Sequence, residues 1–115
     1  MSNFRVERLE QLILQEISAL ILRDEIKDPR VGSMVLVRAV KLSGDLKHAT
    51  VRMSGYVSAD ALEGAVEGLN HGAGFIQSRL GRQLHLRSTP RLHFVADHSI
   101  EEGFNVTETI RKLDA

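Results

Sequence analysis

The longest stretch without a carboxylate holds four arginines that could bind an anion. No Asp or Glu occurs between Gly68 and Ala96, although the chain of 115 residues balances 15 basic against 15 acidic side chains. The arginines of this window are Arg79, Arg82, Arg87 and Arg91. Because guanidinium groups suit phosphate oxygens, the window predicts a basic surface for a nucleic-acid backbone. A solvated surface balanced by acids from elsewhere in the fold fits the composition equally well.

A glycine-rich break lies inside the same window. Gly72-Ala73-Gly74 interrupts a helical pattern that resumes with Ile76 and Leu80. Such a break lets a nucleic-acid backbone approach the main chain, and the N–H groups that start a helix attract anions. Glycine also ends many helices without binding anything, and spacing alone favours that simpler interpretation.

A second candidate contact is the turn that follows the first helical pattern. Lys27 and Arg30 flank Pro29, which biases Asp28 away from helix. The two cations could touch a second phosphate. A helix terminator with exposed charges is the favoured alternative.

Residues typical of catalysis or metal binding do not form a recognisable motif. The chain has no Cys, and its five histidines lack the spacing of a zinc site. Asp97 beside His98 could act as an acid–base pair, but a loop ahead of a helix is the favoured interpretation. We therefore expect no catalytic residue, metal or cofactor.

Helical and strand periods alternate along the chain. A first helix, capped by Ser2 or Asn3, is predicted from the spacing of Leu9, Leu12, Ile13, Ile17, Leu20 and Ile21. Strands are predicted at residues 34–42, 48–54 and 92–96, with residues 83–87 extended. Between them, a helix capped by Ser58 or Asp60 breaks at the glycines and resumes. Ser99 and Glu102 form a capping box for a last helix at about residues 100–113.

These elements predict an α+β domain in which helices cover one face of a three-stranded sheet. Apolar residues on both sides of the segment 34–42 favour a central strand, paired with 48–54 on one edge and 92–96 on the other. The length fits a single domain over residues 1–115. Without a signal peptide or a membrane-spanning apolar run, we expect a cytoplasmic protein.

Several motifs resemble those of the ribosome-binding factor A family. They are Glu25-Ile26-Lys27-Asp28-Pro29-Arg30-Val31-Gly32, Leu42-Ser43-Gly44-Asp45-Leu46, Gly74-Phe75-Ile76, Leu86-Arg87, Pro90-Arg91-Leu92 with Phe94, and Asp97-His98-Ser99-Ile100. The resemblance runs from about Arg5 to Leu113. It implies a type II KH-like domain (a K-homology RNA-binding fold) whose glycine loop is replaced by an Ala-x-Gly kink. Gly72 departs from that Ala, and Gln77 stands where the family often has Arg.

The resemblance also implies partners and a role. The implied partners are the immature small ribosomal subunit and its 16S rRNA. The implied role is to support late maturation of that RNA and growth at low temperature. The resemblance also implies that the protein is a monomer and not an enzyme. The expected RNA-binding residues are Lys27, Arg30, Gly72, Ala73, Gly74, Gln77, Arg79, Arg82, Arg87 and Arg91. The alternative is a protein-interaction module that docks on the ribosome through a protein partner.

Overall fold

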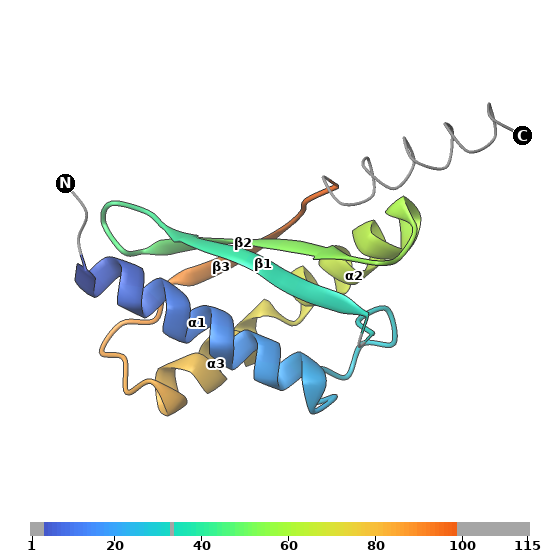
Figure 1. The fold of residues 1–115 in the computed structure, drawn as a ribbon. Coiled ribbons are helices and arrows are strands. Elements are labelled where there is room, and N and C mark those ends of the chain that lie inside the picture. The colour runs from blue at the N-terminus through green and yellow to red at the C-terminus, as the bar shows by residue number, and fades with distance from the viewer. Residues whose placement is uncertain (1–3, 33, 99–115) are drawn as a thin grey trace, which may run out of the picture.

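In the part of the chain that the structure describes, the fold is a small α+β arrangement of three helices and a three-stranded sheet. The structure is a computed structural model that describes residues 4–32 and 34–98. Its elements follow in the order α1 (Phe4–Leu22), β1 (Val35–Leu42), β2 (His48–Gly55), α2 (Ala59–His71), α3 (Ala73–Gln83) and β3 (Arg91–Ala96). α1 and α3 lie beneath the sheet and α2 lies against β3 (Figure 1). The α+β class is confirmed, while the predicted last helix lies outside the described residues.

α1 forms because its apolar residues recur on one face. Ile13, Ile17 and Leu20 are fully buried, and each contributes about 1.5–3 kcal/mol of hydrophobic stabilisation. The helix ends in a Schellman motif, in which the Glu25 N–H donates to the Leu20 carbonyl (3.0 Å) and Asp24 takes a left-handed conformation (φ 54°). This ending directs the following loop away from α1.

The strand order corrects the sequence prediction. The order is β1-β2-β3, with β1 antiparallel to β2 and β2 parallel to β3. The segment expected at the centre is therefore an edge strand, and β2 is central. α2, the kink and α3 form the connection that returns the chain to a parallel strand.

A β-bulge explains why β1 has apolar residues on both sides. The register shifts between Val37 and Ala39, so Arg38 is an extra residue. Since side chains alternate along a strand, one inserted residue exchanges the two faces. Val35, Val37, Val40 and Leu42 consequently all face the core, on one side of the sheet.

Helix side chains cover the outer edge of β3. The Asn70 amide accepts from the Phe94 N–H (2.8 Å) and donates to the Phe94 carbonyl (2.9 Å). Gln77 Oε1 accepts from the Leu92 N–H (3.0 Å). On the opposite edge of the sheet, Glu10 of α1 accepts from the Leu42 N–H (2.8 Å). These backbone groups of both edges thus find partners outside the sheet.

The segment after α3 differs from the expected extended structure. α3 runs to Gln83, and the Leu86 N–H then donates to the Gly81 carbonyl (3.0 Å) around His85, which has a φ of 53°. This is a second left-handed helix ending, and it leads into a turn. The turn carries Arg87 toward the beginning of β3.

Candidate nucleic-acid interface

The glycine kink joins α2 and α3 without an unusual backbone conformation. Gly72 serves both as the C-cap of α2 and the N-cap of α3, with φ −93° and ψ 12°. No glycine in the part of the chain that the structure describes has a positive φ. A Cβ at Gly74 would meet open space. Gly74 therefore has a backbone conformation that other residues can adopt, whereas close approach of a nucleic-acid backbone to it stays a prediction.

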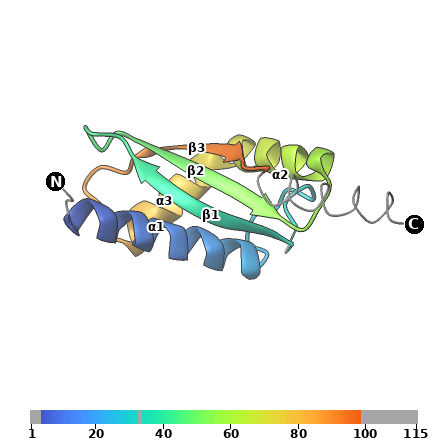
Figure 2. The same cartoon turned by 45° about the horizontal axis from the view of Figure 1, so that its top comes forward.

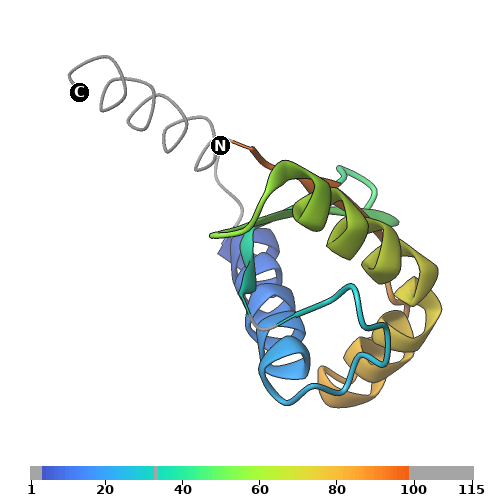
Figure 3. The same cartoon turned by 90° about the vertical axis from the view of Figure 1, so that its right-hand side faces the viewer.

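The structure brings the kink next to the turn at residues 25–29. The loop between α1 and β1 crosses from α1 to the α2–α3 junction (Figure 3). Between them lies a cleft of about 400 Å³, lined by residues 25–29 and by Gly68, His71, Gly72 and Phe75. Asp28 packs so closely on α2 that a Cβ at Gly68 would lie 2.8 Å from its Cγ. We call this space the kink cleft.

Ion pairs compensate the arginines around the kink cleft. Arg79 Nη2 lies 2.9 Å from Glu25 Oε1, and only 23% of the Arg79 side chain is exposed. Arg79 is therefore not one of the uncompensated cations that the acid-free window suggested, because its partner comes from the turn after α1, outside that window. The Arg79 guanidinium also lies 5.8 Å from the centroid of the Phe75 ring, and 45% of Phe75 is exposed.

Arg30 is compensated in the same way. Its side chain donates to both Asp28 oxygens (3.0 and 2.8 Å), its backbone N–H donates to Asp28 Oδ1 (2.9 Å), and Glu67 lies 3.6 Å away. The side-chain hydrogen bond from Arg30, and then the backbone one, lower the pKa of Asp28 to about 2. Lys27 remains exposed, and its ammonium lies 3.5 Å from the Asp24 carbonyl.

Gln77 has a structural task. Its side-chain oxygen holds the Leu92 N–H of β3, in a partly buried hydrogen bond. The Gln77 amide NH2 group takes no part in this hydrogen bond, so a phosphate contact through Nε2 stays a prediction. Asn70 performs the matching task for Phe94, and nothing in the sequence pattern pointed to it.

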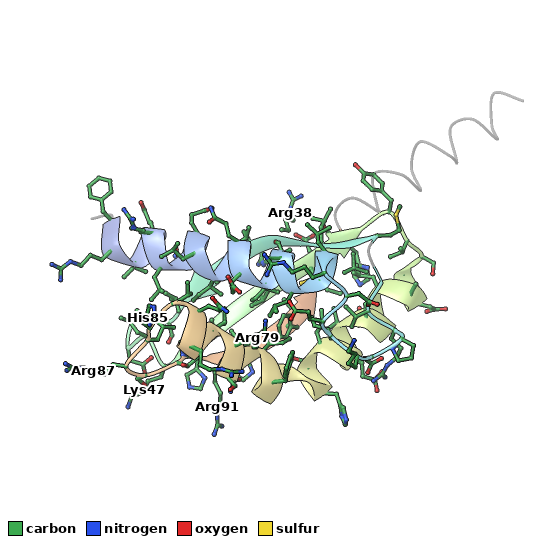
Figure 4. The ribbon with its side chains drawn as sticks, turned by 90° about the horizontal axis from the view of Figure 1, so that it is seen from below. Arg38, Lys47, Arg79, His85, Arg87 and Arg91 are labelled. Carbon is green, nitrogen blue, oxygen red and sulfur yellow. The ribbon has the colours of Figure 1, made fainter. Side chains whose placement is uncertain are left out.

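Three of the predicted arginines are not compensated in this way. Arg82, Arg87 and Arg91 are exposed, and none makes an ion pair within residues 4–32 and 34–98. Figure 4 shows Arg87 and Arg91 at one end of the molecule with Lys47, while Arg79 lies near the middle. The Arg91 N–H donates to the Lys47 carbonyl (2.8 Å), which fixes these two residues side by side. Lys47 was not among the predicted residues, because it precedes β2 and joins the arginines only through strand pairing.

Asp97 and His98, considered as an acid–base pair, each have a partner from another part of the fold. Asp97 Oδ2 lies 3.1 Å from Arg38 Nε, and His98 Nε2 lies 2.7 Å from Glu63 Oε1. Among the described residues, no group of three or more His, Cys, Asp or Glu could hold a metal ion. None of the described helices is long and apolar enough to span a membrane.

Comparisons with known proteins agree on one family. The sequence model of the family "Ribosome-binding factor A" matches residues 5–110. The chain is 41% identical to ribosome-binding factor A of Treponema denticola over 114 residues, which cover 99% of this chain and 86% of the relative. It is 44% identical to that of Acaryochloris marina over 111 residues, which cover 96% of this chain and 80% of the relative.

Solved structures show the same fold. The crystal structure of ribosome-binding factor A from Thermus thermophilus superposes with a TM-score of 0.67 at 27% identity, covering 79% of this chain and 94% of the other. A homology model of the Thermus thermophilus factor, fitted into a cryo-electron-microscopy map of its complex with the 30S subunit, gives a TM-score of 0.57 at 27% identity. This match covers 81% of this chain and 91% of the other.

Proposed function

The chain belongs to the ribosome-binding factor A family, and on that premise we propose that it binds the immature small ribosomal subunit through 16S rRNA. The Thermus relative fitted into a 30S complex supports the small subunit as the partner. The role proposed for this chain is to assist late maturation of 16S rRNA, including at low temperature. It acts as a cytoplasmic monomer, with a KH-like domain as the RNA-binding unit.

One observation carries the RNA contact: Arg82, Arg87 and Arg91 are exposed cations without an acidic partner in the described part of the chain. The charge of an arginine that is paired with a carboxylate is already partly neutralised, so it gains less from a phosphate than a free arginine, which releases only counterions. The three arginines are therefore the principal phosphate contacts. Arg79, Arg30 and Lys27 flank the kink cleft as secondary ones.

The backbone geometry fits recognition of RNA shape. Gly74 leaves open space at the start of α3, where a phosphate could approach the helix N-terminus. Phosphate contacts fix position without selecting sequence. The protein would favour one conformer of the maturing RNA because it binds that conformer more tightly than the other.

Cosedimentation with purified immature small subunits over a salt series tests this function. We expect the Arg82→Glu/Arg87→Glu variant to lose binding at moderate salt, and each neutral single change to lower the log–log salt slope by about one unit or less. Circular dichroism checks that the variants remain folded. Wild-type affinity and slope in the double variant would contradict the proposal.

The kink cleft favours a second candidate, docking through a ribosomal protein. Its lining includes buried Ile26 and half-exposed Phe75, and the two arginines beside it, Arg30 and Arg79, are paired with carboxylates. An apolar cleft with compensated charges suits a protein side chain. Binding that survives high salt and is lost in Phe75→Ala, but not in Arg87→Glu, would favour this candidate.

A further inference from the structure

The sheet contains basic side chains and no acidic ones. None of β1, β2 and β3 includes an Asp or Glu. Their charged and histidine residues are all exposed: Arg38, Lys41, His48, Arg52, Arg91 and His93. Because residues i and i+2 share a face, these side chains stand opposite the buried core residues. We call this surface the open sheet face.

The strand register places these residues next to one another. Lys41 is opposite Thr50, which is opposite His93, and His48 is opposite Arg91. Neighbouring strands lie about 4.8 Å apart, and alternate residues about 7 Å apart along a strand. The three strands lie in front of α3 in Figure 2, with the open sheet face toward the viewer. Long basic side chains from all three strands therefore share one continuous surface.

Two histidines, one from β2 and one from β3, lie side by side on this face. The rings of His48 and His93 are stacked with centroids 5.3 Å apart, and His48 Nδ1 lies 3.2 Å from His93 Nε2. This contact uses one nitrogen of each ring. Because one ring donates and the other accepts in this contact, one of the two outer nitrogens, His48 Nε2 or His93 Nδ1, carries an N–H that can donate to a ligand oxygen.

The cations of this face are largely uncompensated. Lys41, Arg52 and Arg91 make no ion pair within the described ranges. Arg38 is different, since it pairs with Asp97 at 3.1 Å. In a chain without net charge, this separation concentrates positive potential on one face.

We propose that the open sheet face binds the phosphate backbone of RNA, as a second contact surface beyond the kink and α3. The inference rests on the proposed function, because the path of the same RNA would continue from Arg91 across β2 to Lys41. Separated cations with a ring N–H donor between them match a chain of phosphates. A protein partner would need apolar anchors, and the exposed apolar residues here are mainly Leu36 and Val95.

The test compares three single charge reversals that change net charge equally. Arg52→Glu alters the open sheet face, Arg87→Glu alters the surface of the proposed function, and Arg8→Glu alters an exposed position on α1. Each is measured by cosedimentation with small subunits and by binding to protein-free 16S rRNA, across a salt series. We expect Arg52→Glu to weaken both by at least about tenfold and to lower the salt slope, with Arg8→Glu near wild type. His48→Ala/His93→Ala should weaken both several-fold.

Each other outcome overturns the proposal and identifies what failed. Wild-type binding by Arg52→Glu with weak binding by Arg87→Glu removes the open sheet face and leaves the proposed function intact. Wild-type binding by both removes the RNA contacts of the proposed function as well. Weakened binding to subunits but not to free RNA assigns the face to a ribosomal protein. Equal losses in Arg52→Glu and Arg8→Glu show only an effect of net charge.

Discussion

Asn70 of α2 and Phe94 of β3 are joined by two hydrogen bonds that satisfy both backbone polar groups of Phe94. The contact spans 24 residues of sequence and is partly buried. A side-chain amide can donate and accept at the same time, as this paired arrangement requires. The pair therefore fixes the height of α2 along β3 and, with it, the position of the kink that follows.

Asn70→Ala should reduce the free energy of unfolding by roughly 1–3 kcal/mol, because it leaves the Phe94 N–H and carbonyl without partners. Urea unfolding measures the loss. Gln83→Ala, at an exposed position, is the matched control and should change stability by less than about 0.5 kcal/mol. Equal stability of the two variants would mean that water replaces the amide at no cost.

Arg79 and Arg82 should respond differently to charge reversal. Arg79→Glu places a second carboxylate beside Glu25 in a partly buried site, so we expect a loss of roughly 1–2 kcal/mol. Arg82→Glu should leave the melting temperature nearly unchanged. The exchange Arg79→Glu/Glu25→Arg should recover most of the loss in thermal unfolding, and no recovery would argue against the ion pair.

Gly68 and Gly64, one turn apart on α2, provide a matched pair. Either change to Ala gains up to about 1 kcal/mol of helix propensity. At Gly64 the new Cβ would lie 3.9 Å from Arg30 Cδ, an ordinary contact, but at Gly68 it would lie 2.8–3.1 Å from the Asp28 carboxylate. We expect Gly64→Ala to raise the melting temperature and Gly68→Ala to lie at least about 1 kcal/mol below it in stability. A Gly68→Ala variant as stable as Gly64→Ala would show that Asp28 moves freely.

Asp28 should contribute to acid stability. Its pKa falls from 3.8 to about 2 on folding, so the unfolded chain binds more protons between these values. The stabilisation is complete above about pH 4 and is lost as the pH falls toward about 2. Asp28→Asn should flatten that part of the curve of unfolding free energy against pH. Asp45, whose pKa is lowered mainly by the Ser43 hydroxyl, contributes with the same sign and would remain in the variant.

The local sequence pattern predicted the helices and strands well, but it predicted less well which strands lie next to one another. The helices α1 and α2 and the strand β2 were predicted because each shows its hydrophobic period within one continuous segment. The Ser58 cap of α2 is confirmed, because its Oγ accepts from the Ala61 N–H (3.1 Å). The strand order depends on pairing between distant segments. In β1, the bulge at Arg38 shifts the alternation by one residue, so the sequence resembles that of a strand buried on both faces.

The site residues were harder to predict because charge compensation is a tertiary property. The window from Gly68 to Ala96 contains no acid, yet Glu25 reaches Arg79 from 54 residues away. Lys47 reaches Arg91 only because β2 pairs with β3. Counting acids along the chain therefore located the basic region but could not separate paired arginines from free ones.

The side chains on the outer edge of β3 also limit how partners can be recognised. With the Leu92 N–H and both Phe94 backbone groups occupied by Gln77 and Asn70, an incoming peptide cannot extend the sheet by strand addition at this edge. The same occupation prevents a nucleobase from pairing with these main-chain groups. Recognition here must use side chains and helix ends, which distinguish ligands by charge and shape more than by sequence.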